Sequence, residues 1–143
     1  MISITKIFRF EAAHAIYEYP GSCQNIHGHS YELWVTVQAR QANEEFISGL
    51  GIIIDFKDLK TMVQEAVIKV LDHKLILSNV YLAQTKNTFP SDELVKFDFE
   101  PTAENLLIFS RNQICSCLPE HVQIKSLRLY ETRDSFADWS DVK

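Results

Sequence analysis

Apolar and polar residues alternate along four segments of this chain, at residues 2–11, 30–40, 123–132 and 136–139. Successive side chains of a strand point to opposite faces, so this alternation predicts strands with one buried face. A loop at residues 17–25, interrupted by Pro20 and Gly21, separates the first two segments. We expect these two strands to pair in the antiparallel sense.

Two further segments carry apolar residues at the spacing of an amphipathic helix. Asp55 is a candidate N-cap for the first helix, which we expect over residues 56–71. Thr102 is the candidate cap of the second helix, which opens at Pro101. That helix ends before Pro119, because proline cannot continue a helix.

The order of these elements is strand, strand, helix, helix, strand, strand. It predicts a single α+β domain over residues 1–143, with a four-stranded antiparallel sheet and two helices on one face. Residues 79–100 fit neither pattern well. They contain Pro90, and residues 94–99 form a candidate short strand.

Composition narrows the possible partners. The net charge is −5 and no cluster of Lys and Arg stands out, which argues against nucleic acid but allows a small anionic ligand. No apolar run is long enough to span a membrane, and the N-terminus lacks the features of a signal peptide. We therefore expect a cytoplasmic protein without a membrane partner. Of three cysteines, Cys115 and Cys117 are interpreted as packing residues of the second helix.

The sharpest chemical feature is His27-Gly28-His29. In a strand, residues two apart face the same side, so both imidazoles can meet at one point. His14 stands near the end of the preceding strand, which antiparallel pairing can bring alongside. Three neutral imidazoles suit Zn²⁺ and leave its fourth position open, as in catalytic zinc sites. The alternative is that these are ordinary surface or hydrogen-bonded histidines.

Three other residues are weaker candidates. Cys23 lies four residues before His27, where it is either a fourth zinc ligand, a free thiol whose thiolate a nearby cation favours, or a loop cysteine without a role. Asp72 and His73 follow the first helix. An acid beside a histidine can orient the imidazole, although the pair also suits the negative end of a helix dipole.

Six motifs occur in order along the chain: FRFEAAH, C-x-x-x-HGH, GIIIDFKDLK, LDH, PTAEN and YET. This set resembles the 6-pyruvoyltetrahydropterin synthase and 6-carboxytetrahydropterin synthase family. The resemblance implies the tunnelling fold, in which three sheets close a barrel and two trimers stack as a hexamer. It also implies active sites at subunit interfaces and 7,8-dihydroneopterin triphosphate as substrate.

The resemblance further implies a role for each candidate residue. His14, His27 and His29 would bind Zn²⁺, Cys23 would be the catalytic thiol, and Asp72 with His73 its partner pair. Glu131 would hold the pterin ring, with Thr102 near it. A carboxylate suits this task, since its two oxygens match the paired N–H donors of the aminopyrimidinone edge. Without the resemblance, Glu131 would be interpreted as an exposed strand residue.

The spacing C-x-x-x-HGH is closer to the bacterial members. We therefore expect the 6-carboxytetrahydropterin synthase reaction of the queuosine precursor route, a carbon–carbon lyase reaction that releases acetaldehyde and triphosphate. The alternatives are 6-pyruvoyltetrahydropterin synthase, which eliminates triphosphate and keeps the carbons, and a noncatalytic pterin- or zinc-binding module.

Two departures from the family pattern affect this expectation. Ser22 stands where relatives often carry Lys, which removes a cation beside the thiol. The segment between His73 and Pro101 is longer than in compact bacterial members. The cations that bind triphosphate stay unassigned, and the candidates are Arg9, Lys57 and Lys74.

Overall fold

The computed structural model describes residues 2–41 and 46–141. In this part of the chain six strands form one sheet in the order β4-β3-β1-β2-β5-β6. The strands are β1 (Ser3–His14), β2 (His27–Ala39), β3 (Lys74–Ser78), β4 (Leu94–Phe97), β5 (Val122–Thr132) and β6 (Ser135–Ser140). The helices are α1 (Phe56–Val63), α2 (Lys69–Leu71), α3 (Asn79–Thr85) and α4 (Ala103–Cys117), and a π-helical turn, Gln64–Ile68, joins α1 to α2.

The prediction of a four-stranded antiparallel sheet is wrong. β3 pairs parallel with β1, and β4 pairs parallel with β3, so the sheet is mixed and has six strands. The missed strand β3 is flanked by strands on both sides, and its apolar residues Leu75, Ile76 and Leu77 run without alternation. Parallel strands buried on both faces typically show such continuous runs, which a search for alternation does not find. Helix α3 was missed as well.

The other predicted elements are confirmed, with shifted ends. The helix expected over residues 56–71 forms as α1, the π-helical turn and α2, and its N-cap Asp55 accepts a hydrogen bond from the Lys57 amide. Thr102 caps α4 by accepting from the Asn105 amide. The first strand runs three residues further than expected, to His14, and the second begins three residues earlier, at His27.

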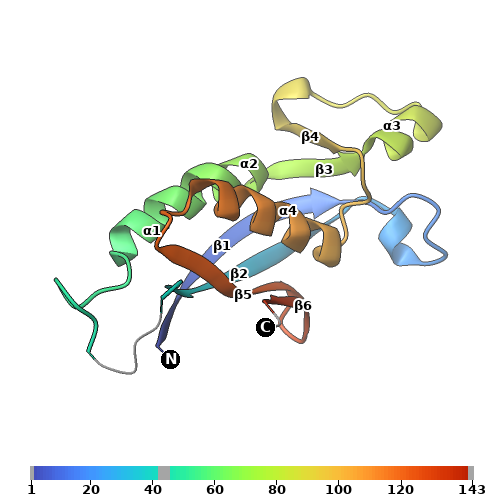
Figure 1. The fold of residues 1–143 in the computed structure, drawn as a ribbon. Coiled ribbons are helices and arrows are strands. Elements are labelled where there is room, and N and C mark those ends of the chain that lie inside the picture. The colour runs from blue at the N-terminus through green and yellow to red at the C-terminus, as the bar shows by residue number, and fades with distance from the viewer. Residues whose placement is uncertain (1, 42–45, 142–143) are drawn as a thin grey trace.

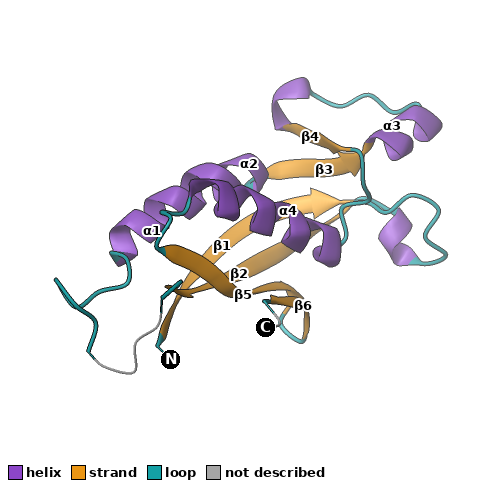
Figure 2. Cartoon of the chain, in the orientation of Figure 1, coloured by secondary structure: helices purple, strands orange, loops and turns teal. Residues whose placement is uncertain are grey.

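The helices α1, α2 and α4 lie on one face of the sheet, as Figures 1 and 2 show. The core lies between these layers, where Phe8, Phe10 and Leu33 of the sheet belong to one buried cluster with Leu59 of α1 and Leu106 of α4. Apolar burial of this kind is the main favourable term in folding. It fixes which face of β1 and β2 points toward the helices, and therefore where their terminal histidines lie. Within the described residues no helix is long and apolar enough to cross a membrane.

Candidate functional site

The pairing of β1 with β2 assembles a cluster of three histidines. The antiparallel register sets His14 opposite His27 and Ala12 opposite His29. The ligand nitrogens of the three rings all lie within 4.8 Å of one another. The convergence expected from the sequence is therefore confirmed, because alternation places these side chains on the same face as the buried Phe8 and Phe10.

Hydrogen bonds to carbonyl oxygens fix the proton on two of the rings. His14 Nδ1 donates to Pro101 O at 2.7 Å, and His27 Nδ1 donates to Asn25 O at 2.7 Å. A carbonyl oxygen only accepts, so each neutral ring carries its proton on Nδ1 and presents a lone pair on Nε2. The two Nε2 atoms lie 3.1 Å apart. Two facing lone pairs repel each other unless a cation lies between them.

The ring of His29 also indicates a cation site between the imidazoles. His29 Nε2 is buried and has no hydrogen-bond partner among the described residues. Burial lowers the pKa of His14, an effect that the bond to Pro101 partly offsets, and burial also lowers the pKa of His29. Both effects of burial favour the neutral form that binds metals. Zn–N distances of about 2.0–2.1 Å at tetrahedral angles separate two ligand nitrogens by about 3.3 Å, so the cluster fits a metal ion of this size.

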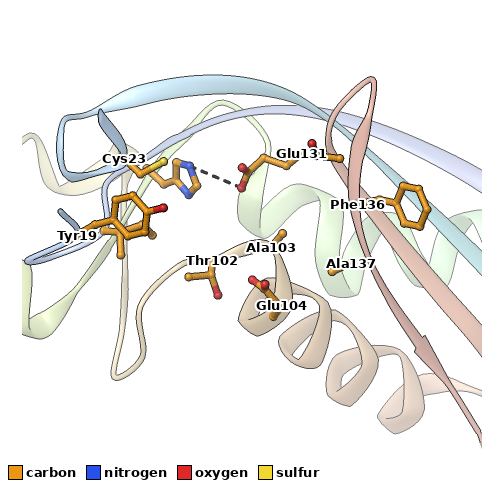
Figure 3. Close-up of a pocket in the computed structure, with 11 residues that line it drawn as sticks. Tyr19, Cys23, Thr102, Ala103, Glu104, Glu131, Phe136 and Ala137 are labelled. Atoms are coloured by element: carbon orange, nitrogen blue, oxygen red, sulfur yellow. Dashed lines mark ion pairs between the residues drawn. The ribbon is translucent and has the colours of Figure 1, made fainter. Parts of the chain in front are cut away.

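A pocket of about 310 Å³ opens beside His14. Figure 3 shows Cys23 and Tyr19 on one side of it, Glu131 and Phe136 on the other, and Thr102 at the start of α4. The remaining lining residues are Ile16, Ala103, Glu104, Ser135 and Ala137. One cavity thus collects the predicted thiol, the predicted pterin anchor and one predicted metal ligand.

Local structure explains how two of these side chains are held. Cys23 lies in a 3₁₀ turn, Ser22–Gln24, and its carbonyl accepts a hydrogen bond from the Ile16 amide at 2.8 Å, which closes the loop between β1 and β2. Glu131 is the penultimate residue of β5 and lies on the face of the histidines, with its carboxylate oxygens 3.9 Å from His14 Nε2 and 3.8 Å from His29 Nε2. Glu131 therefore lies beside the histidine cluster, and Cys23 lines the same pocket as His14.

Asp72 and His73 lie elsewhere. They follow α2, and the His73 backbone adopts a left-handed conformation with φ 59°. The Asp72 carboxylate accepts a hydrogen bond from the Glu11 amide at 3.0 Å and lies 2.9 Å from His73 Nδ1. His73 lines a second pocket, of about 450 Å³, and its side chain is 79% exposed. Within one chain the structure thus forms this pair but places His73 in a different pocket from Cys23 and Glu131.

The sequence did not identify Tyr19 or Phe136 as site residues. Tyr19 is an aromatic residue in a loop otherwise read as a turn, and Phe136 belongs to a short strand; only their position beside the predicted residues marks them. The proposed triphosphate cations lie outside the Cys23 pocket. Arg9 pairs with Glu32 at 2.8 Å, and Lys74 donates to Asp92 O at 2.6 Å while lining the second pocket.

The family model described as 6-pyruvoyl tetrahydropterin synthase matches residues 3–141. The chain belongs to this family. Among curated members of the synthase family, a 6-carboxy-5,6,7,8-tetrahydropterin synthase of Haemophilus influenzae is 31% identical over 147 residues, covering 99% of this chain and all of that protein. The enzyme of the same name from Rickettsia typhi is 30% identical and covers 96% of this chain and 99% of its own length.

Solved structures of similar proteins agree with this family assignment at the level of the fold. An uncharacterized protein of Wolinella succinogenes has a TM-score of 0.78 at 19% identity, covering 99% of this chain and 98% of its own. The 6-pyruvoyl tetrahydropterin synthase of Plasmodium vivax has a TM-score of 0.72 at 20% identity, covering 97% and 98%. This chain therefore has the fold of the synthase family.

Proposed function

We propose that this chain is a zinc-dependent 6-carboxy-5,6,7,8-tetrahydropterin synthase of the queuosine precursor route. It converts 7,8-dihydroneopterin triphosphate and one water into the 6-carboxy pterin, acetaldehyde and triphosphate. The observation that carries the proposal is the pocket in which Cys23 and Glu131 flank a cluster of three convergent imidazoles. The full-length similarity to enzymes of this name supports the same reaction.

His14, His27 and His29 would hold the metal through their Nε2 atoms. When bound there, zinc supplies a Lewis acid that lowers the pKa of a coordinated substrate hydroxyl. The protein contributes the orientation of the rings, because the carbonyls of Pro101 and Asn25 keep the Nδ1 protons away from the metal side. Neutral imidazoles whose ligand nitrogens already lie within 4.8 Å of one another are close to the arrangement that a metal requires.

Cys23 would move the proton at a carbon of the substrate side chain. Its place in the same pocket as His14 puts a thiol within reach of a substrate bound at the metal cluster. Glu131 would accept the paired N–H donors of the pterin through its two oxygens, with Thr102 and the first turn of α4 closing that side of the pocket. With these roles, the side chain of the substrate points toward the metal and its pterin ring lies toward β5.

Asp72 and His73 would complete the active site of a neighbouring subunit. The Asp72 carboxylate lies beside Nδ1 of His73 and leaves Nε2 for proton transfer, but the ring points into a separate pocket. A hexamer built as a dimer of trimers, with active sites at subunit interfaces, would bring the pair to a second chain. Strands β4 and β6 end the sheet on either side, and such edges are usually covered or paired.

Complementation between inactive variants tests this arrangement. Co-expressed Cys23→Ala and His73→Ala chains should form mixed oligomers that regain activity, because some sites then combine an intact Cys23 with an intact His73. Mixed oligomers without recovered activity would show that both residues must belong to one chain.

Mass analysis of the pterin product tests the proposed reaction. Zinc-loaded protein and 7,8-dihydroneopterin triphosphate should yield 6-carboxy-5,6,7,8-tetrahydropterin. A 6-pyruvoyl product would assign the other activity of the family. Unchanged substrate in the presence of bound zinc would instead indicate a binding module.

A further inference from the structure

Glu100 connects the end of β3, the loop that leaves β1 and the start of α4. Its Oε1 accepts a hydrogen bond from Ser78 Oγ at 2.8 Å, and its Oε2 accepts one from the Tyr17 amide at 3.1 Å. Ser78 ends β3, whereas Tyr17 belongs to the loop that leaves β1. One carboxylate therefore joins the end of β3 to the loop that carries Cys23.

The Ser78 hydroxyl has a fixed direction in this network. Ser78 is 1% exposed, and its Oγ accepts from the Tyr81 amide at 3.0 Å, at the first turn of α3. Its single hydroxyl proton is then free to donate to Glu100. A buried hydroxyl of this kind loses free energy when its acceptor is removed, because no water replaces the lost hydrogen bond.

The main chain of Glu100 links this network to the histidine cluster. Its carbonyl accepts from the Thr102 amide at 2.8 Å and from Asn105 Nδ2 at 3.0 Å. These contacts fix the backbone on both sides of Pro101, a buried residue whose carbonyl accepts from His14 Nδ1 at 2.7 Å. The position of Glu100 therefore sets the acceptor that orients the His14 ring.

The loop end of the network reaches the thiol. Tyr17 lies three residues after His14, and the adjacent Ile16 amide donates to the carbonyl of Cys23. A displacement of Tyr17 would thus shift both the end of β1 and the turn that holds Cys23.

We propose that Glu100 is a positioning residue that holds the His14 ring and the Cys23 turn in place for metal binding and catalysis. The inference rests on the proposed function of the histidine cluster. Glu100 acts by accepting two hydrogen bonds and not by transferring a proton, since its oxygens face Ser78 and Tyr17 and it lies outside the residues that line the Cys23 pocket.

Two substitutions separate the hydrogen bonds of Glu100 from its charge. Glu100→Ala removes both acceptors. Glu100→Gln keeps one oxygen for the Tyr17 amide and can donate its own amide to Ser78 Oγ, so it retains both connections but leaves the Ser78 hydroxyl proton without its acceptor. Glu65→Ala, which removes an exposed carboxylate from the π-helical turn, is the matched control.

The readouts are the zinc affinity of the apoprotein, by competition with a chromophoric chelator, and the alkylation rate of Cys23, by peptide mass analysis. Glu100→Ala should bind zinc about 10- to 100-fold more weakly, the usual effect of losing a group that orients a metal ligand. Its Cys23 should also be alkylated at a changed rate. Glu65→Ala should match the parent in both measurements, and Glu100→Gln should lose less zinc affinity than Glu100→Ala.

Two results would overturn the inference: parent-like zinc affinity and alkylation in folded Glu100→Ala, or a loss in Glu100→Gln as large as in Glu100→Ala. If Glu100→Ala does not fold, Ser78→Ala removes one of the two connections and should show a smaller loss of zinc affinity. A parent-like zinc affinity in Ser78→Ala would also contradict the inference. A parent that binds no zinc would refute the proposed function, whereas the alkylation rates in the apoprotein would still test whether Glu100 positions the Cys23 turn.

Discussion

His14 Nε2 and His27 Nε2 face each other at 3.1 Å, and in the neutral rings neither atom carries a proton. Both rings donate from Nδ1 to a backbone carbonyl, so the short separation joins two lone pairs. This arrangement is unfavourable for two neutral imidazoles alone and favourable around a cation. It is the strongest structural argument for a metal centre in this protein.

The first prediction concerns the third ligand. His29→Ala should leave the protein folded but reduce its zinc content well below one ion per chain, because only two imidazoles remain. Elemental analysis of protein purified without added metal measures this directly, alongside His121→Ala, which changes an exposed histidine far from the cluster in sequence. Unchanged zinc in folded His29→Ala would refute the ligand assignment.

The stability of the apoprotein should depend on pH through the same histidines. Burial lowers the pKa of His14 and His29 below the ordinary 6.5, so the unfolded chain binds more protons than the folded chain at mildly acidic pH. The free energy of unfolding should therefore fall as pH drops below about 6.5 and level off above it. Urea unfolding of zinc-free protein should show this slope, and His29→Asn should make it shallower. An identical slope in the parent and in His29→Asn would contradict the assigned cause.

Several features of this site could be predicted from the sequence because they follow from local periodicity. Alternation places His27 and His29 on one face, and the antiparallel pairing of β1 with β2 brings His14 beside them. Strand β3 could not be found in this way, since its apolar residues Leu75, Ile76 and Leu77 follow one another without alternation. Tyr19 and Glu100 owe their importance to contacts between segments distant in sequence, such as Tyr17 with Glu100, which no local pattern encodes.

Cys23 should control the chemical step. Cys23→Ala should retain zinc and pterin binding, because the thiol is neither a metal ligand nor the ring anchor in this account. Its single-turnover rate should fall by roughly 10²–10⁴-fold, the usual contribution of a general base. Cys115→Ala, which removes an exposed thiol from α4, is the matched control. A parent-like rate in Cys23→Ala would transfer the role of base to His73.

Glu131 should control recognition of the pterin. Glu131→Gln replaces one acceptor oxygen by an amide donor that would face the N–H groups of the ring. Pterin binding should weaken by about 2–3 kcal/mol, more than for a neutral hydrogen bond, while the zinc content stays unchanged. Titration with a substrate analogue at matched zinc content measures the loss. Equal pterin affinity would remove Glu131 as the anchor, and a loss of zinc would make it a metal ligand instead.

The central claim is that this chain cleaves a carbon–carbon bond of its substrate at the three-histidine centre. The most direct test measures acetaldehyde and triphosphate released in the same reaction of zinc-loaded protein with 7,8-dihydroneopterin triphosphate. The account predicts one acetaldehyde for each triphosphate, and neither product from zinc-free protein. Triphosphate released without acetaldehyde would contradict the claim, because the substrate would then have lost its phosphates while keeping all of its carbons.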